Sequence, residues 1–447
     1  MANNLNQAEI NAIENYSDEI KTLKDFVSAC RRMPGMYIGG VSNRGYLSLI
    51  REIYQNSVDQ LVKPGSPATE VYLYYNMQTL QVTVRDNGLG LPYKDMERIL
   101  TVPNTSKNYE KRVGEYSSGK HGIGCKATNA LSSRLIARSY KYDGTAMEFT
   151  TTEGYPDKFK NKSNPYPIKN KNKFQGSEIT FYPCEILGEI NLDWKVVYTQ
   201  MKRILLRSKL GAILHFEAVD SNGVTHKEDI VNKDGIIGDL IEKSKNPICR
   251  PITVSQDNGY MKLEAAFVFD AGGKEGPSTT EEVISFCNMC PTQLGTHEDG
   301  VVDGITKWFV KYINNIYLSN SKSKTTVIAA DIKTGLVVSI NAAMLEPIFV
   351  GQAKEQLSNP EMAPFCRDTV MSALDEWSKA NPQDLAKLCK YFKEIAEVRI
   401  KSSGEKLKIV TRYQENSLTG YPRKYKKPLK AKRDFMIVEG DRLQYCL

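Results

Sequence analysis

One segment near the N-terminus limits strongly what this chain can be, because it carries three polar side chains on a single helical face. Residues 45–62 read GYLSLIREIYQNSVDQLV, and their apolar residues recur at the spacing of an amphipathic helix. Glu52, Asn56 and Asp59 follow one another at spacings of four and three, so they share one face of that helix. A common ligand would meet all three side chains there.

Two glycine-containing segments follow the helix. The first, RDNGLGLP, ends a predicted strand at Asp86, and Gly88 and Gly90 allow the backbone to approach a ligand closely. The second, SSGKHGIGCKATNALSS at 117–133, opens a predicted helix with the glycines 119, 122 and 124. Backbone amides at such a helix start can bind phosphate.

Each of these pieces is common by itself, because a glycine-rich turn is usually only a turn and an exposed Asn is usually solvated. Their order is much more specific, and it resembles the GHKL (Bergerat-fold) ATPases. The segments RRMPGMYIGG (31–40), GSEITFYP (176–183) and GQAKEQL (351–357) are similar to the ATPase subunit of type II DNA topoisomerases, the gyrase B and topoisomerase IV family. The resemblance implies an α+β or α/β fold: a GHKL ATPase sandwich followed by a ribosomal-S5-like transducer domain.

The resemblance also implies ATP and Mg²⁺ as cofactors and gives roles to particular residues. Glu52 matches the general base that activates the water attacking the γ-phosphate. Asn56 matches the side chain that completes the Mg²⁺ shell. Asp86 matches the acceptor of the adenine amino group, and Ser177 matches a hydroxyl near the adenine. Lys354 matches the transducer lysine that reaches the γ-phosphate from the second domain.

Further nucleotide contacts are implied in the same way. Tyr16 lies eighteen residues before Pro34, where the family's N-terminal arm places a tyrosine on the partner subunit's nucleotide; an ordinary exposed tyrosine is the alternative. The expected nucleotide-binding residues are Tyr16, Asn56, Asp59, Asp86, Gly88, Gly90, Lys107, Gly119, Lys120, His121, Gly122, Ile123, Gly124, Lys126, Ser177 and Gln352.

Four positions depart from the bacterial pattern of the family. Leu89 stands where that pattern has Arg, and Gln60 stands where it has an acid. Losing both partners of an ion pair is much less damaging than leaving one charge unpaired, so we expect an intact site. Ser48 replaces a His, and Ala353 replaces the Thr of a Gln-Thr-Lys motif.

The composition is that of a soluble multidomain protein, with 447 residues of which 41% are hydrophobic. Neither a membrane-spanning run nor a signal peptide is recognisable, so we expect a cytoplasmic or otherwise intracellular location, including that of a virus-infected cell. The nine cysteines are scattered, which favours reduced thiols. Cys287 and Cys290 form a close pair without a second pair to complete a zinc site.

The net charge of +8 is distributed unevenly. Residues 158–173 (KFKNKSNPYPIKNKNK) and 423–433 (RKYKKPLKAKR) are dense basic runs. Such a density of Lys and Arg is typical of contacts with nucleic-acid phosphates. A lysine-rich loop is more often merely solvated, and both interpretations stay open.

We expect three parts: an N-terminal arm with the ATPase domain (1–230), a transducer domain (231–400), and a basic linker with the first strand of an incomplete Toprim domain (401–447). In the first part we expect strands at 69–76, 80–88 and 176–183 and a helix over 194–214. In the second we expect strands at 263–270, 282–288 and 325–332, a helix over 303–317 and a helical stretch from 367 to about 400.

The segment MIVEGD resembles the first Toprim strand and delivers Glu439, one ligand of that domain's metal site. No later Asp-x-Asp pair follows it, so we expect that this chain alone does not cut DNA. The expected partners are DNA, a second copy of the chain on ATP binding, and a cleavage subunit or a chain with the rest of Toprim; no membrane partner is expected.

The resulting hypothesis is an ATP-operated gate that closes around a DNA segment held by a basic transducer surface and reopens after hydrolysis. The alternative is an ATP-dependent DNA-binding clamp or interaction module without topoisomerase activity. A sensor histidine kinase needs a phosphoacceptor His before the ATP domain, but the first His is His121. Mismatch-repair proteins and the ninety-kilodalton chaperone share the ATP site but give no reason for RMPGMYIGG.

Overall fold

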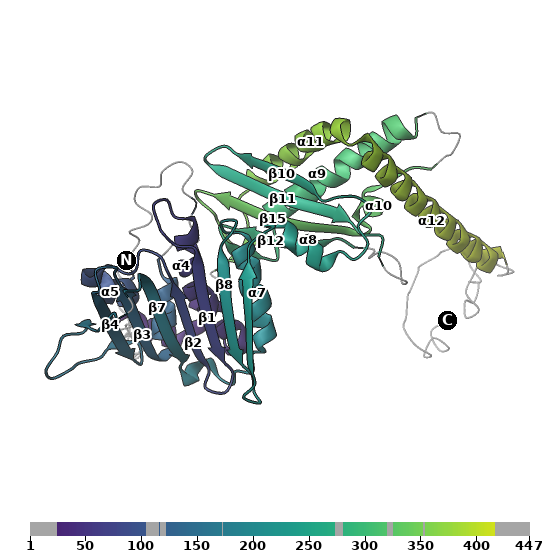
Figure 1. Ribbon diagram of the computed structural model, residues 1–447. Coiled ribbons are helices and arrows are strands. Elements are labelled where there is room, and N and C mark those ends of the chain that lie inside the picture. Colours follow the sequence, from purple (N-terminus) through teal and green to yellow (C-terminus); the bar gives the residue numbers. More distant parts are fainter. Residues whose placement is uncertain are drawn as a thin grey trace, which may run out of the picture.

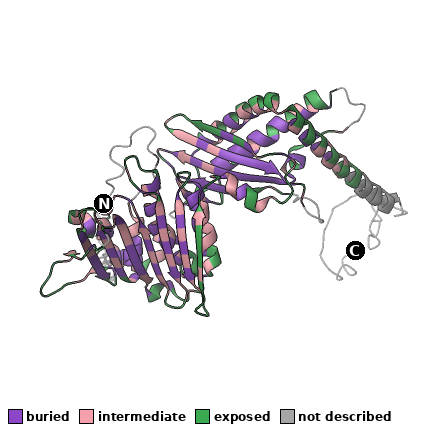
Figure 2. Ribbon diagram, viewed as in Figure 1, coloured by how far each residue is buried: buried purple, intermediate pink, exposed green. Residues whose placement is uncertain are grey.

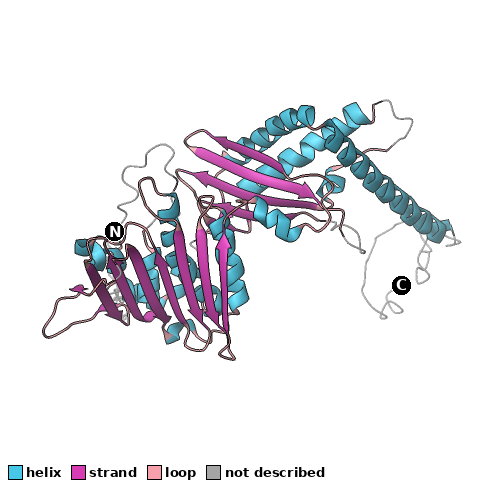
Figure 3. Ribbon diagram, in the orientation of Figure 1, coloured by secondary structure: helices cyan, strands magenta, loops and turns pink. Residues whose placement is uncertain are grey.

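The computed structural model describes residues 25–103, 116, 122–171, 173–272, 280–319, 325–351 and 354–415. Within these ranges the chain forms two large sheets, each with helices packed against it (Figure 1 and Figure 3). The expected sandwich of mixed α and β elements is confirmed.

The first sheet is built from strands whose side chains alternate between the core and the outside. Strands β1 (Glu70–Asn76) and β2 (Gln81–Asp86) bury every second residue. The strand order is β5-β4-β3-β7-β2-β1-β8-β9, with β6 on β4, and only the β1–β8 pair is parallel among the described pairs of this sheet. The other strands are β3 (Ser132–Tyr140), β4 (Ala146–Thr152), β5 (Tyr155–Pro156), β6 (Tyr166–Pro167), β7 (Gly176–Pro183), β8 (Ile213–Val219) and β9 (Thr225–Val231).

Helix α4 (Ser42–Val62) is the central helix of this first unit. It packs against β1, β2, α6 and α7, and the rings of Tyr46 and Tyr54 are fully buried. Burial of large apolar and aromatic side chains is the main stabilising term here. The remaining helices of this unit are α2 (Phe26–Arg32), α3 (Pro34–Ile38), α5 (Met96–Thr101), α6 (Gly124–Ala130) and α7 (Trp194–Leu206), with 3₁₀ turns at Tyr93–Asp95 and Glu185–Leu187.

A single row of directly paired residues crosses the outward side of the first sheet from β6 to β9. Its members are Tyr166, Glu148, Arg138, Glu178, Arg85, Tyr72, His215 and Asp229. The Nε and Nη1 atoms of Arg138 donate to Glu148 at 2.6 Å and to Glu178 at 2.7 Å. The rings of Tyr72 and His215 stack with centroids 4.3 Å apart. Cross-strand pairs of this kind fix the register of neighbouring strands.

The second sheet has the order β10-β11-β15-β12-β13. Its strands are β10 (Ile252–Asp257), β11 (Met261–Phe269), β12 (Glu282–Cys287), β13 (Cys290–Thr292) and β15 (Leu336–Met344), and β14 (Leu294–Gly295) pairs separately with β16 (Gln356–Leu357). The helices are α8 (Ile237–Lys243), α9 (Thr296–Tyr312) with a π-helical turn at Ile313–Tyr317, α10 (Ala329–Lys333), α11 (Met362–Ala380) and α12 (Pro382–Glu415).

Three secondary-structure expectations are wrong. The helix expected over 194–214 ends at Leu206; Gly211, with a φ of 84°, then turns the chain before β8 begins at Ile213. The strand expected at 325–332 does not form, and residues 329–333 form helix α10 instead. At the start of α10 the Ile328 amide donates to Asp331 Oδ2 at 2.9 Å. The helical stretch expected from 367 to about 400 is two helices, since Pro382 begins the second, which continues to Glu415.

The two units share apolar contacts along β12. Ile284 and Phe286 of β12 pack in the same buried cluster as the residues of α4 and β2, although their strand belongs to the second sheet. Figure 2 shows this buried region continuing from one sheet toward the other. The second sheet therefore contributes directly to the core that supports α4.

Candidate nucleotide-binding site

The polar face of α4 lies at the centre of the candidate site. The side chain of Glu52 is 21% exposed, and Asn56 Nδ2 donates to the backbone oxygen of Glu52 at 2.8 Å. Asp59 continues the same face and is half-buried. The structure thus brings Glu52, Asn56 and Asp59 together as the helical spacing predicted.

Asp86 is the most buried acid of the candidate site, with 1% of its surface exposed. Its Oδ2 accepts from Ser177 Oγ at 2.6 Å and from Ser57 Oγ at 3.0 Å, and its Oδ1 accepts from the Gly88 amide at 2.9 Å. Burial raises the pKa of Asp86, and the hydrogen bonds from Ser177, Gly88 and Ser57 oppose that rise. The sequence pointed to Ser177 through the resemblance, but nothing in it singled out Ser57.

The backbone after Asp86 is packed so closely that glycine is required. A Cβ on Gly88 would lie 2.8 Å from Asp86 Oδ1. Gly90 has a φ of 71°, and a Cβ there would lie 2.8 Å from the oxygen of Gly176. Between them, the carbonyl of Leu89 accepts from Lys141 Nζ at 2.5 Å.

At one of the departures from the bacterial pattern, the buried Oε1 atom of Gln60 has no hydrogen-bond partner among the described residues. The side-chain stem of Gln60 lies against Gly88, so that a Cβ added to that glycine would be 2.9 Å from Gln60 Cβ. A neutral residue at this position leaves no charge without a partner.

The described end of the glycine segment lies directly against Glu52. Helix α6 begins at Gly124, and a Cβ added to Gly124 would lie only 1.8 Å from Glu52 Oε2. Gly122 has a φ of 57°, Ile123 precedes the helix, and Lys126 within it is buried. The glycine at 124 therefore allows the start of α6 to approach Glu52.

Lys354 reaches Glu52 from the second unit. Its Nζ lies 3.6 Å from Glu52 Oε1, and only 8% of the residue is exposed. Burial works against the charge on Lys354, but the carboxylate of Glu52 outweighs it, so the pKa of Lys354 lies above its usual range. Next to it, Glu355 Oε1 pairs with Arg44 Nη2 at 2.5 Å, a second ion pair between the units.

A hairpin of the second unit makes a contact that the sequence did not reveal. Strands β12 and β13 are joined by Asn288 and Met289, whose φ values are 48° and 63°, and the Met289 carbonyl accepts from Gln55 Nε2 at 2.6 Å. Gln55 is 2% exposed and lies between Glu52 and Asn56 on α4. Cys287 and Cys290 are the paired residues at the base of this turn.

Several expectations concern residues outside this site or outside the described ranges. None of the eight described cysteines forms a disulfide, and the described residues hold no group of three or more His, Cys, Asp or Glu suited to a metal ion. In the same ranges, no helix is both long and apolar enough to cross a bilayer. The following predicted residues lie outside the described ranges: Tyr16, Lys107, Gly119, Lys120, His121, Gln352, Ala353 and Glu439.

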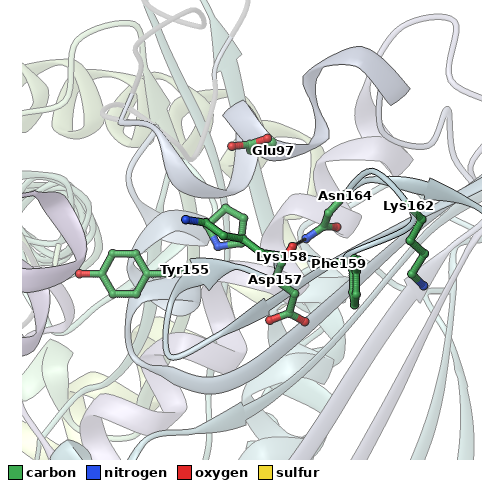
Figure 4. Close-up of a pocket in the computed structure, with 8 residues that line it drawn as sticks. Glu97, Tyr155, Asp157, Lys158, Phe159, Lys162 and Asn164 are labelled. Carbon is green, nitrogen blue, oxygen red and sulfur yellow. Dashed lines mark hydrogen bonds between the residues drawn. The ribbon is translucent and has the colours of Figure 1, made fainter.

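A separate cavity of about 660 Å³ lies at the edge of the first sheet (Figure 4). It is lined by Glu97, Tyr155, Pro156, Asp157, Lys158, Phe159, Lys162 and Asn164. None of the predicted nucleotide-binding residues lines it, so it is distinct from the constellation around Glu52.

Two protein-family models match the sequence. Residues 48–179 match the model described as "Histidine kinase-, DNA gyrase B-, and HSP90-like ATPase". Residues 228–407 match the model described as "DNA gyrase B". The first match contains α4 from residue 48 onward, the Asp86 turn and the glycine segment, and the second contains Lys354.

Curated relatives carry the same family name. The B subunit of DNA gyrase from Chlamydia pneumoniae is 26% identical over 394 residues, which are 83% of this chain and 46% of that protein. Its counterpart from Archaeoglobus fulgidus is 27% identical over 396 residues, 85% of this chain and 59% of that protein. The chain thus spans about half the length of the curated relatives it matches.

Solved structures share the fold. The ATP-binding domain of topoisomerase IV from Francisella tularensis matches with a TM-score of 0.60 and 25% identity, over 83% of this chain and 97% of that one. The 43K ATPase domain of Thermus thermophilus gyrase B matches with a TM-score of 0.62 and 22% identity, over 85% and 98%. The ATPase region of Saccharomyces cerevisiae topoisomerase II gives 0.59 and 20%, over 85% and 100%.

Proposed function

We propose that the chain belongs to the DNA gyrase B family of ATPases and that it works as the ATP-operated gate of a type II DNA topoisomerase. The observation that carries this proposal is the approach of Lys354 Nζ to within 3.6 Å of Glu52 Oε1. The two side chains belong to different units, so Lys354 could contact a γ-phosphate bound here while Glu52 holds the attacking water. Nucleotide chemistry and the relative position of the units are then coupled.

In the proposed reaction, Glu52 is the general base. Its carboxylate accepts a proton from the water that attacks the γ-phosphate. Lys354, whose raised pKa keeps it cationic at neutral pH, contacts the γ-phosphate and stabilises the charge that develops there. Asp86 accepts from the adenine amino group, with Ser177 beside it; a buried acceptor of this kind rejects guanine.

The Mg²⁺ that accompanies ATP fits the residues present. Asn56 uses its amide nitrogen in the hydrogen bond to the Glu52 carbonyl, so the amide oxygen is the atom available to a cation. A single protein ligand suits Mg²⁺, which otherwise takes phosphate oxygens and water. When bound, the ion would neutralise part of the phosphate charge.

We assign the remaining nucleotide contacts in the same proposal. The phosphate-wrapping lid comprises residues 119–124, with Lys107, Lys120 and His121 among its polar side chains and Lys126 in the helix that follows. Gln352 accompanies Lys354. Asp59, Gly88 and Gly90 line the adenine side of the nucleotide. Tyr16 reaches the nucleotide from the N-terminal arm of a second copy.

The proposed partners are those of a strand-passage machine. Two copies close on ATP, hold a DNA segment and reopen after hydrolysis. A cleavage subunit, or a chain with the rest of the Toprim domain, carries out DNA breakage. Glu439 of this chain would be one ligand of the Toprim metal site. The proposed boundaries are 1–230 for the arm and ATPase domain, 231–400 for the transducer and 401–447 for the linker and first Toprim strand.

The test is steady-state ATP hydrolysis by the purified chain over a range of protein concentrations. We expect turnover per chain to rise with protein concentration, because closure of the gate needs two copies. Glu52→Ala should bind ATP but not hydrolyse it, and Glu189→Ala, which removes an exposed carboxylate elsewhere, should behave as wild type. Hydrolysis by Glu52→Ala at the wild-type rate would contradict the assignment of the base, and turnover independent of concentration would contradict the gate.

A further inference from the structure

The segment between β4 and β7 forms a loop that projects from the edge of the first sheet, on the side away from the second sheet (Figure 1). We call residues 158–173 the lysine loop. Apart from the two-residue strand β6, it has no regular secondary structure among its described residues. Figure 2 shows most of it as exposed.

The lysine loop carries a concentrated positive charge. It contains six lysines and no Asp or Glu; the lysines are Lys158, Lys160, Lys162, Lys169, Lys171 and Lys173. All six are exposed, and none forms an ion pair with a carboxylate of the described residues. Lysines on a protein surface are commonly interspersed with acids, so a run of this length without one creates a local field that attracts anions.

The backbone of the lysine loop is held in place by buried or half-buried side chains. Asn164 Nδ2 donates to the backbone oxygens of Thr150 at 2.7 Å and Asp157 at 3.0 Å. Asn170, which is 8% exposed, donates to the oxygens of Lys141 at 2.9 Å and Phe174 at 2.8 Å. A loop that is already ordered loses less conformational entropy when it binds a ligand.

An aromatic cluster orders one of the lysines without neutralising it. Lys162 Nζ lies 3.2 Å from the ring centroid of Tyr166 and 4.3 Å from that of Phe159. These rings meet edge to face at 5.5 Å. Figure 4 shows Lys158, Phe159 and Lys162 around the cavity at the base of the loop. A cation–π contact positions the ammonium group, which also interacts electrostatically with the Glu148 carboxylate but forms no ion pair with it.

We propose that the lysine loop is a docking site for the phosphate backbone of duplex DNA, separate from the nucleotide site and from the basic transducer surface. The proposal rests on the proposed function only in taking DNA as the partner. Six point charges on a fixed loop recognise the spacing of phosphates and not the identity of bases. The site therefore binds DNA without sequence preference.

Duplex DNA fits the lysine loop better than a single strand does. Sites for single strands present aromatic rings on which unpaired bases stack. Here Phe159 and Tyr166 pack edge to face and Lys162 Nζ lies over both rings, so a base could stack on the covered faces only by displacing that ammonium group. A duplex also carries one negative charge per about 1.7 Å of its axis, so several lysines can contact phosphates simultaneously.

The experiment measures binding of the full chain to a fluorescently labelled duplex by anisotropy over a range of KCl concentrations. The test variant carries Lys158→Gln, Lys160→Gln and Lys162→Gln. The matched control carries Lys63→Gln, Lys209→Gln and Lys233→Gln, three exposed lysines outside the loop, and so removes the same charge. An unlabelled single strand of the same length serves as competitor.

We expect the test variant to bind the duplex about tenfold more weakly and its log–log salt slope to fall by about 2 to 3, while the control changes much less. Equal losses in both variants, absence of duplex binding by wild type, or tighter binding of the single strand would each overturn the proposal. ATP turnover without DNA should be the same in all three proteins. A wild type that binds the duplex but does not hydrolyse ATP would instead contradict the proposed function and leave the DNA site standing.

Discussion

Gln55 of α4 and Met289 of the β12–β13 hairpin are joined by a hydrogen bond of 2.6 Å from the side-chain amide to the backbone carbonyl. Gln55 lies three residues after Glu52 and one before Asn56 on the same helix. The second unit therefore holds the helix that carries the proposed base, at a point separate from Lys354.

Gln55→Met removes this hydrogen bond with little change in side-chain volume. The carbonyl of the half-buried Met289 then loses its partner, which costs about 0.5 to 1.5 kcal/mol. We expect ATP turnover to fall by roughly tenfold or more while the affinity for nucleotide changes little. Turnover and nucleotide binding should be measured together, with Gln78→Met in an exposed turn as the control. Equal losses in both variants would argue against a positioning role.

Gly124→Ala tests how closely α6 approaches the base. The new methyl group would lie 1.8 Å from Glu52 Oε2, and the flexible end of the Glu52 side chain would move away from it. We expect a folded protein with a melting temperature near that of wild type and a turnover reduced by about a hundredfold. Gly35→Ala, where a Cβ meets no atom within 4 Å, should keep wild-type turnover. A Gly124→Ala enzyme of full activity would show that Glu52 is not confined by α6.

Asp86→Asn tests the proposed adenine site. The carboxylate accepts from Ser57, Ser177 and the Gly88 amide, whereas an amide side chain offers one oxygen and places an N–H group against those donors. We expect ATP affinity to fall by roughly tenfold to a hundredfold and the preference for ATP over GTP to shrink. Calorimetric titration with both nucleotides measures this. Asp143→Asn in an exposed turn is the control, and an unchanged ATP/GTP ratio would contradict the assignment.

His297 makes the second unit sensitive to acid. It is fully buried, and burial lowers its pKa to about 3. Between its unfolded pKa of about 6.5 and about 3, the unfolded chain therefore binds a proton that the folded chain does not. The free energy of unfolding should fall as the pH drops through that window, by up to about 1.4 kcal/mol per pH unit from this group.

Urea unfolding of wild type and His297→Gln at several pH values isolates this contribution. Because other groups titrate in both proteins, the informative quantity is the difference between their two slopes. Parallel pH profiles for wild type and His297→Gln would show that His297 does not contribute.

Helices and strands were predictable from the sequence where the local pattern of apolar residues determines them. Residues 176–183 form β7 as expected, and α4 contains the expected helix, because side-chain alternation and helical spacing there match the final burial. The helix α10 was not predictable, because the β-branched residues at 325–328 just before it favour a strand. Its start depends on Asp331, which is paired with Arg399 of α12 at 2.7 Å, a partner distant in the chain.

The residues of the candidate site were likewise predictable only where local sequence pattern places them. Glu52, Asn56 and Asp59 share a face through local spacing, and Asp86 ends a strand that alternates clearly. Ser57 and Gln55 could not be singled out, because their partners, Asp86 and the Met289 carbonyl, reach them only through tertiary packing. A glutamine whose partner is a backbone atom leaves no complementary residue in the sequence to reveal it.

The row of paired residues from Tyr166 to Asp229 has a mechanical consequence. Sliding any inner strand of the row along its neighbours would break contacts with the strands on both sides, such as the two hydrogen bonds of Arg138. The first sheet should therefore move as a rigid body. Conformational changes that accompany nucleotide turnover are then confined to the contacts between this sheet and the second unit. Amide exchange should be slowest in the central strands and should change most around the β12–β13 hairpin.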